Sequence, residues 1–426
     1  MKKFVHIILL IGLFTLLSKA QPYGNEWIDY SKTYYKFKIG KTSLYRIPQS
    51  VLVSLGIPSN QLIGTSFKLI RNGKEVPLYV SNNNIFSTSD FIEFYGEKND
   101  GKPDSVLYKS PLDQPNPNQN IFADSATFFL TLDPFSINAR IIQQANDLTA
   151  LPSPEEYCYT TTQHIANNPS QLYGIGRGFT VSPFFPQLYN SDYEVGEGAI
   201  ASSFDNAGLY RFFNSTSGGL TNLKQFVRSA AVNAYFTARV ATGSGNHVLK
   251  LTINSFDTTV NTFGPTTKII QQTFPSSFLN GNGLEFIAIN ELATKANYIG
   301  YAALQYPRLF NFENDTKALF AIKKNADVYL EVRNLNAVST TPVLYDIENK
   351  QRYVGITDTV LKFHLLETLK QREQVYLSAQ DTISIPIIRK FSALTFTNFL
   401  SANQQGNFLI ISNKKLKSST NGVDNI

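Results

Sequence analysis

The sequence contains a single cysteine, Cys158, in 426 residues, so it cannot form an intramolecular disulfide. Charged residues are also scarce, at 16% of the chain against a usual value of about 25%. Apolar residues nevertheless make up 42% and aromatic residues 13%, with 32 Phe and 22 Tyr. This composition excludes a disordered chain and a Glu/Lys-rich helical protein, and it favours stability that comes from packed strands.

Histidine is scarce as well, and the residues that usually carry chemistry do not cluster. No His-x-x-x-His, Glu-x-x-His or Cys/His spacing is present around the four histidines. We therefore predict no catalytic, cofactor-binding or metal-binding residue. His164 is placed in a linker-like segment, His247 beside a hairpin turn and His364 on the polar face of an alternating strand.

The N-terminus has the pattern of a cleaved export signal. Lysines follow Met1, a mostly apolar run extends from Phe4 to Leu17, and small residues precede a cleavage point after Ala20. The alternative is an uncleaved anchor, but the run is shorter than the roughly 20 residues that span a bilayer. Removing residues 1–20 takes away three lysines and lowers the formal net charge from +6 to +3.

For the mature chain we expect no nucleic-acid partner and no transmembrane segment. Its basic residues do not form the clusters that a nucleic-acid footprint needs. No later segment is apolar enough over a membrane-spanning length, so we predict no transmembrane segment after cleavage. The length favours two or three folding units.

Alternation with period two dominates the chain and predicts a mainly β protein with antiparallel sandwich or jelly-roll units. Asn72-Gly73 predicts a tight hairpin turn, and residues 48–56 a short helix ended by Gly56. We expect an N-terminal β-rich domain over residues 21–150 and a sandwich over 155–312, with Ala234 to Val240 alternating into its core. Residues 313–397 form either a further β module or the completion of that sandwich.

Asn407 to Ser412 form an apolar strand without polar alternation, which is typical of a strand buried on both faces of a parallel sheet. We expect residues 398–426 to be the start of a domain whose remainder is truncated.

Several residues allow a catalytic interpretation beside a plainer one. Cys158 is either a small buried hydrophobe, which we favour, or a catalytic partner of His164. The glycines of 173–179 only partly match a phosphate loop, because Phe179 stands where glycine is needed. Two carboxylate pairs could serve glycoside hydrolysis or bind calcium, but solvated turn residues are the better interpretation. These pairs are Glu97 with Asp100 and Glu194 with Glu197.

Five segments in order resemble the N-terminal region of the gingipain-like cysteine peptidases, with the PorU-like sortases of the type IX secretion system of Bacteroidetes as the nearest group. They are "KIGKTSLYRIPQSVLVSLGI", "FYGEKNDGKPDS", "ALQYPRLF", "VLYDIENK" and "GNFLIISNKK". The resemblance implies an exported protein at the periplasm, outer-membrane surface or cell exterior. Its implied partners are exported cargo proteins or outer-membrane components of that secretion system.

In that family, β-rich units precede a caspase-like α/β peptidase domain whose catalytic His and Cys would lie beyond residue 426. The resemblance therefore implies a non-catalytic region that positions a peptidase domain and has no activity of its own. The alternative function is a stand-alone surface module that binds carbohydrate or protein through its sandwich. In that case some of the abundant tyrosines would form a stacking platform rather than core.

Overall fold

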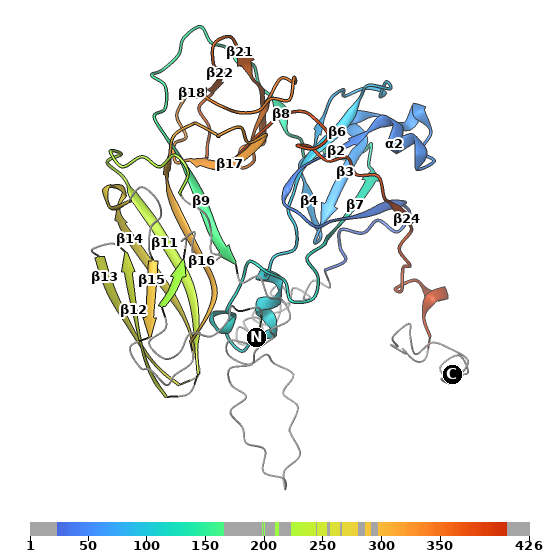
Figure 1. The fold of residues 1–426 in the computed structure, drawn as a ribbon. Helices are drawn as coiled ribbons and strands as arrows, with labels where there is room; N and C mark the ends of the chain where they lie inside the picture. The colour runs from blue at the N-terminus through green and yellow to red at the C-terminus, as the bar shows by residue number, and fades with distance from the viewer. Residues whose placement is uncertain are drawn as a thin grey trace, which may run out of the picture.

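The computed structural model describes residues 24–165, 198, 200, 209–212, 223–243, 245–253, 256–264, 266–279, 286–290 and 297–406. These residues are mainly β, and all but one of the strand ladders between named elements are antiparallel, as the alternation predicts. Figure 1 shows a sandwich on one side, an N-terminal unit on the other, and a third group of strands above them.

The N-terminal unit consists of two sheets, in the orders β24-β1-β7-β3-β4 and β2-β6-β5. Their strands are β1 (Tyr34–Ile39), β2 (Ser43–Pro48), β3 (Phe67–Arg71), β4 (Lys74–Val76), β5 (Tyr79–Val80), β6 (Phe91–Gly96), β7 (Ala126–Leu132) and β24 (Ser392–Leu394). A core that includes Phe37, Phe94 and Phe128 joins the two sheets. Strand β24 comes from far along the chain and pairs with β1.

The predicted local signals of this unit are confirmed. Asn72 and Gly73 have φ of 50° and 73° and turn the chain between β3 and β4. The short helix α2 (Gln49–Ser54) follows Pro48, and Gly56 after it has a φ of 83°. Both turns use the left-handed region that glycine enters without steric cost.

The sandwich has two sheets facing each other across one core. One sheet is β10-β15-β12-β13, and the other is the β14-β11-β16-β9 end of a nine-stranded sheet. The strands are β9 (Cys158–Ile165), β10 (Leu209–Phe212), β11 (Asn233–Thr242), β12 (Asn246–Ile253), β13 (Phe256–Phe263), β14 (Thr266–Pro275), β15 (Phe286–Asn290) and β16 (Asn297–Arg308). The predicted inward residues of β11, from Ala234 to Val240, lie in the core together with Leu249 and Leu251 of β12.

The nine-stranded sheet continues past β9 into the third group of strands, in the order β17-β23-β19-β20-β8. A smaller sheet, β18-β22-β21, packs on it around a core that contains Cys158 and Phe363. The strands are β8 (Ile142–Gln143), β17 (Lys317–Ile322), β18 (Val328–Val332), β19 (Val343–Asp346), β20 (Gln351–Val354), β21 (Ile356–Thr357), β22 (Leu361–Leu365) and β23 (Arg372–Ser378). The parallel ladder joins β20 to β8.

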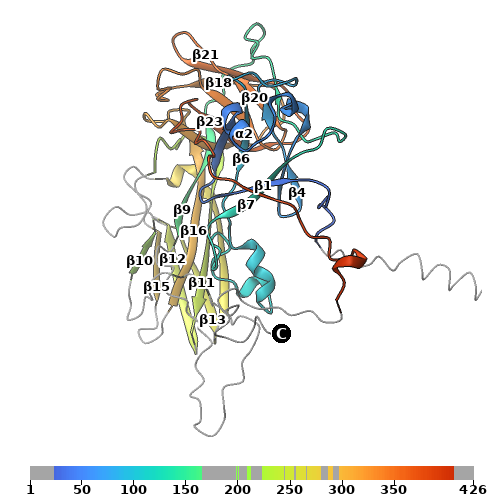
Figure 2. The same cartoon turned by 90° about the vertical axis from the view of Figure 1, so that its right-hand side faces the viewer.

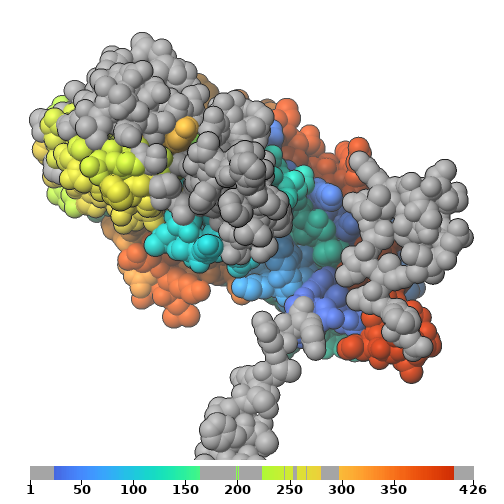
Figure 3. All heavy atoms as spheres, turned by 90° about the horizontal axis from the view of Figure 1, so that it is seen from below, coloured from blue at the N-terminus to red at the C-terminus, as the bar shows by residue number. Residues whose placement is uncertain are grey.

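One loop of the N-terminal unit contacts the sandwich end of the nine-stranded sheet. Residues 97–125, between β6 and β7, include 3-10 turns at Lys102–Leu107 and Pro111–Asp113. Arg239 of β11 donates to the carbonyl of Gln114 at 2.6 Å, and Thr267 of β14 donates to that of Asp113 at 3.1 Å. Figures 2 and 3 show this cyan segment beside the yellow-green sandwich strands.

Two predictions from the sequence fall outside the described residues: the signal peptide over 1–20 and the apolar strand over 407–412. Within the described part of the chain, no helix is long and apolar enough to cross a membrane.

Candidate functional site

A buried charged cluster lies between the N-terminal unit and the third group of strands. Its centre is Glu93 of β6, whose side chain is fully buried in an otherwise apolar strand. Arg46, directly opposite on β2, donates from Nε and Nη2 to Glu93 Oε1 at 2.8 and 2.5 Å. Strand pairing inside one unit therefore builds the first half of the cluster.

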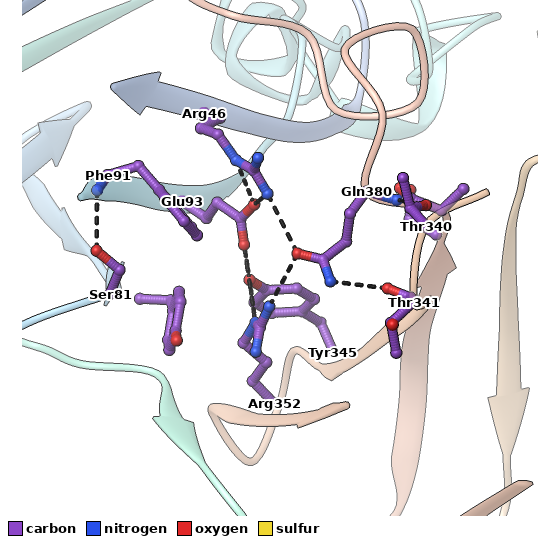
Figure 4. Close-up of polar contacts among 12 residues, drawn as sticks. Arg46, Ser81, Phe91, Glu93, Thr340, Thr341, Tyr345, Arg352 and Gln380 are labelled. Carbon is purple, nitrogen blue, oxygen red and sulfur yellow. Dashed lines mark hydrogen bonds and ion pairs between the residues drawn. The ribbon is translucent and has the colours of Figure 1, made fainter. Parts of the chain in front are cut away.

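The third group of strands supplies the other half (Figure 4). Tyr345 of β19 donates its hydroxyl hydrogen to Glu93 Oε2. Arg352, opposite Tyr345 on β20, donates from Nε to the Tyr345 oxygen at 2.9 Å, and this nitrogen is 3.7 Å from Glu93 Oε2. One carboxylate thus links residues that are about 250 positions apart in the sequence.

Two glutamine side chains accept the remaining hydrogen bonds from the arginines of the cluster. Gln380 Oε1 accepts from Arg46 at 3.3 Å and from Arg352 at 3.4 Å. Gln143 accepts from Arg352 Nη1 at 2.5 Å. The Arg46 guanidinium lies 4.1 Å from the ring centroid of Phe91. Buried charges are tolerated only when paired and hydrogen-bonded, and this arrangement meets that condition.

Two members of the cluster, Tyr345 and Arg352, have pKa values raised by their surroundings. Burial, and then the charge of Glu93, raise the pKa of Tyr345 well above its ordinary value, so Tyr345 remains a neutral donor. Burial alone would lower the pKa of Arg352, but Tyr345 and Glu93 outweigh it and raise that pKa. Because Glu93 has no exposed surface, this arrangement is suited to holding two units together rather than to contacting a substrate.

An apolar layer surrounds the charges. It consists of Leu44, Tyr95, Ile141, Val343, Tyr345, Tyr376 and Ile385, which come from both units. Tyr376 and Ser43 add a hydroxyl contact of 3.0 Å across the same junction. The charged cluster and this layer, which we call the junction, form a second core between the units.

The cysteine and histidines singled out in the sequence do not assemble into a catalytic group. Cys158 is fully buried, and burial raises the pKa of its thiol to about 12. His164 lies six residues further along the same strand, β9, which separates the two by about 20 Å. This strand geometry is incompatible with a dyad, whereas the interpretation of Cys158 as a small buried hydrophobe agrees with the structure.

The other two histidines are buried. His247 is 1% exposed, and its Nε2 lies 3.0 Å from the carbonyl oxygen of Gly243. The prediction that His364 lies on a polar face is wrong, because His364 is 6% exposed in β22. Its Nδ1 lies 2.7 Å from the carbonyl oxygen of Asp147, which provides one of the two ring nitrogens with a partner.

The carboxylates named as possible ligands are turn residues where they are described. Glu97 pairs with Arg71 at 3.1 Å, and Asp100 pairs with Lys102 at 3.2 Å. Glu194, Glu197 and residues 173–179 lie outside the described residues. Among the residues that are described, no three His, Cys, Asp or Glu side chains group as metal ligands would.

Sequence reasoning missed the members of the buried cluster. The available signal was a single charge inside an apolar strand, as at Glu93 in "FIEFYG" and Arg46 in "SLYRIP". A charge at such a position needs a buried partner, but the sequence does not say which residue provides it.

Comparison with known proteins gives limited results. No protein-family profile matches the chain, and no curated protein does. Dimeric latent PorU from Porphyromonas gingivalis is similar in structure with a TM-score of 0.49 and 10% identity, over 82% of this chain and 32% of that one. This chain thus spans about a third of the length of latent PorU.

Two other solved structures show weaker similarity. BuGH86 in complex with neoagarooctaose has a TM-score of 0.20 and 9% identity over 65% of this chain and 32% of that one. The major capsid protein P2 from bacteriophage PM2 has a TM-score of 0.16 and 9% identity, over 65% of this chain and 88% of that one. All these similarities are too loose to indicate a function.

Proposed function

We propose that this chain is an exported, non-catalytic β scaffold of the gingipain-like cysteine peptidase type, closest to the PorU-like sortases. Its role is to hold a peptidase domain in position relative to exported cargo or an outer-membrane partner. The observation that carries this proposal is the buried charged cluster, which joins two units of the chain at a place where reaction chemistry has no access.

Three of the five segments that carry the family resemblance lie in this cluster or directly beside it. The first segment, residues 38–57, contains Arg46, and the fourth, residues 343–350, contains Tyr345. The second segment begins at Phe94, the residue after Glu93. This overlap supports a role in which the relative placement of the two units matters.

The environment of the cysteine supports the interpretation of this chain as a scaffold rather than as a peptidase. A cysteine nucleophile needs an accessible thiol that ionises near neutral pH, as beside a histidine or at a helix N-terminus. Cys158 has the opposite environment, since it is buried and its thiol pKa is raised to about 12.

A peptidase assay tests the non-catalytic part of the proposal. Purified residues 21–426 are incubated with casein and with peptides from the C-terminal signals of exported proteins. We expect no cleavage above the level seen with the Cys158→Ala variant. Turnover by the wild-type chain that disappears in Cys158→Ala would contradict the proposal.

Cross-linking in cells tests the positioning role. A photoreactive residue replaces Leu369, which is 99% exposed on the third group of strands, or Phe135, which is 97% exposed on the N-terminal unit. We expect the cross-linked peptides to come from a caspase-like peptidase domain with a His and a Cys in its active site. Cross-linked products at both positions that contain no peptide of a peptidase domain would count against this role.

Export is tested separately by N-terminal sequencing of the mature protein from the native host. Cleavage after Ala20 predicts Gln21 as the first residue. A chain that keeps Met1 in the cytoplasm would contradict export.

A further inference from the structure

The tip of the loop between β6 and β7, residues 111–117, lies against the sandwich sheet on the face that points away from the core (Figure 2). Arg239 of β11 and Thr267 of β14 hold this tip by hydrogen bonds of 2.6, 3.3 and 3.1 Å. The acceptors are the main-chain carbonyl oxygens of Gln114, Pro111 and Asp113. The sandwich therefore contacts the main chain of the tip, as a receptor contacts an extended peptide.

A further contact comes from Gly300 of β16, where the two main chains meet. The register between β11 and β16 shifts beside Arg239, which makes Gly300 the extra residue of a β-bulge. A Cβ atom at Gly300 would lie 1.9 Å from the carbonyl oxygen of Pro115, so only glycine admits the tip at this distance. We call Arg239, Thr267 and Gly300 the tip site.

The sequence of the tip sets its conformation. Pro115 and Pro117 fix their own φ near about −65° and bias the residues before them, Gln114 and Asn116, toward extended backbone. Gln114 accordingly has a φ of −71° and a ψ of 120°. Because prolines have no N–H group, the main chain of the tip presents mainly acceptors. The tip site matches it with donors, a guanidinium group and a hydroxyl group.

The tip does not satisfy every buried donor at this place. The Nε of Arg239 and the Nδ2 of Asn116 are buried, and neither has a hydrogen-bond partner among the described residues. A buried donor without a partner costs free energy. A segment that offers an acceptor to Arg239 Nε would therefore bind the tip site more favourably than residues 111–117 do.

We propose that the tip site binds a proline-containing extended segment of a partner protein, and that residues 111–117 occupy the site when this partner is absent. The bonds from Arg239 and Thr267 end on main-chain oxygens, so the site recognises an extended conformation rather than the side chains of the tip. Proline sets that conformation before binding, which lowers the entropic cost of association. This inference does not rest on the proposed scaffold function.

The base of the loop is held independently of the tip. Asn99 Nδ2 donates to two carbonyl oxygens at 3.1 and 2.9 Å, and the carboxylate of Asp104 accepts hydrogen bonds at 2.8 and 3.1 Å. The partners are Ala123, Ser125, Asn120 and Ile121. Replacing residues 111–117 by glycine and serine should therefore leave the base in place and open the tip site.

Fluorescence anisotropy with a labelled peptide of residues 109–119, KSPLDQPNPNQ, tests the proposal. We expect the tip-replaced form of purified residues 21–426 to bind this peptide saturably. The wild-type chain should bind at least tenfold more weakly, because its own tip competes at a millimolar effective concentration. A peptide with Pro115→Ala and Pro117→Ala should also bind the tip-replaced chain more weakly, since its conformation is no longer set in advance.

Substitutions in the tip-replaced chain locate the binding. Arg239→Ala removes the main donor, and Gly300→Ala places a Cβ atom where the main chain of the ligand would lie, so each should lower the affinity at least tenfold. Arg228→Ala is the matched control and should bind as the tip-replaced parent does. Arg228 is an exposed arginine of the same sandwich, and it donates to the carbonyl oxygen of Ser277 at 3.1 Å rather than to the tip.

Two results would overturn the proposal: no peptide binding by a folded tip-replaced chain, or unchanged affinity in both Arg239→Ala and Gly300→Ala. If the tip-replaced chain does not fold, as judged by its thermal unfolding, hydrogen exchange of the wild-type chain decides. Millimolar unlabelled peptide should then accelerate exchange in residues 110–119, and unchanged exchange would reject the proposal. Its failure leaves the scaffold proposal intact, since that proposal is read out by cross-linking.

Discussion

At the scale of single residues, Glu93 decides how firmly two units are joined. Glu93→Gln keeps the shape of the side chain but leaves Arg46 and Arg352 without a counter-charge. Removing one partner of a buried ion pair costs about 3–5 kcal/mol, so we expect a loss of that order in the free energy of urea unfolding. Glu97→Gln breaks a surface pair with Arg71 and should cost about 1 kcal/mol or less. Equal losses in the two variants would show that the cluster does not hold the junction.

The thiol of Cys158 gives a second residue-scale prediction. With a pKa of about 12, roughly one thiol in ten thousand is ionised at pH 8, and the strand around it blocks access. We expect no alkylation by iodoacetamide at pH 8 in the folded protein and full alkylation in urea, as measured by intact mass. Rapid alkylation of the folded protein at pH 8 would contradict the burial of this side chain.

Asp133 should make stability depend on pH. Burial alone would raise the pKa of Asp133, but hydrogen bonds from Lys32, Ser136 and Lys68 outweigh it and lower that pKa below 3.8. A carboxylate with a lowered pKa stabilises the fold above its unfolded pKa, and this contribution is lost as the pH falls through the folded value. Asp133→Asn should therefore destabilise the protein by about 1–2 kcal/mol at pH 7 and by much less at pH 2.5. The measurement is urea unfolding of both proteins, and a difference that is constant with pH would count against this account.

At the scale of elements, alternation in the sequence identified strands and their buried faces but not their partners. The alternating residues from Ala234 to Val240 face the core as predicted. Leu249 and Leu251 share that core, yet β11 and β12 belong to different sheets of the sandwich. The period-two pattern reports which side of a strand is buried and carries no information on the neighbouring strand. The cluster around Glu93 was missed for the same reason, since its pairing with Tyr345 depends on that long-range topology.

The loop of residues 97–125 packs closely against Gly300 of β16. A Cβ atom at this position would lie 1.9 Å from the carbonyl oxygen of Pro115, so Gly300→Ala should displace the loop. We expect faster hydrogen exchange in residues 97–125 while the strands of the sandwich keep their protection. Gly40→Ala is the control, because its Cβ would meet only Ser125 Oγ at an ordinary 3.7 Å. Unchanged exchange in the loop of Gly300→Ala would mean that this contact does not hold it.

At the scale of the whole molecule, the two ends of the described chain meet in the N-terminal unit. Trp27 packs against Phe396, with ring centroids 5.4 Å apart, and Tyr34 packs against the same ring at 5.2 Å. Nearby, β24 extends the first sheet next to β1. The N-terminal unit is therefore completed by residues that follow both other parts of the chain, so its stability depends on them.

This dependence predicts how a fragment behaves. Residues 21–150 alone lack β24, Phe396, Tyr345 and Arg352, so Glu93 and Arg46 lose their outer partners and the apolar residues of the junction meet water. Burying such surface contributes about 25 cal/mol per Å², and native domains are stable by only about 5–15 kcal/mol. We expect the fragment to bind 8-anilinonaphthalene-1-sulfonate and to give a poorly dispersed amide NMR spectrum, whereas residues 21–406 unfold cooperatively.

Co-expression with residues 151–406 should restore a folded complex, because the missing partners then come from the second chain. A well-dispersed spectrum and cooperative unfolding of the isolated fragment would show instead that the N-terminal sheets are self-sufficient and that the junction only docks two finished domains.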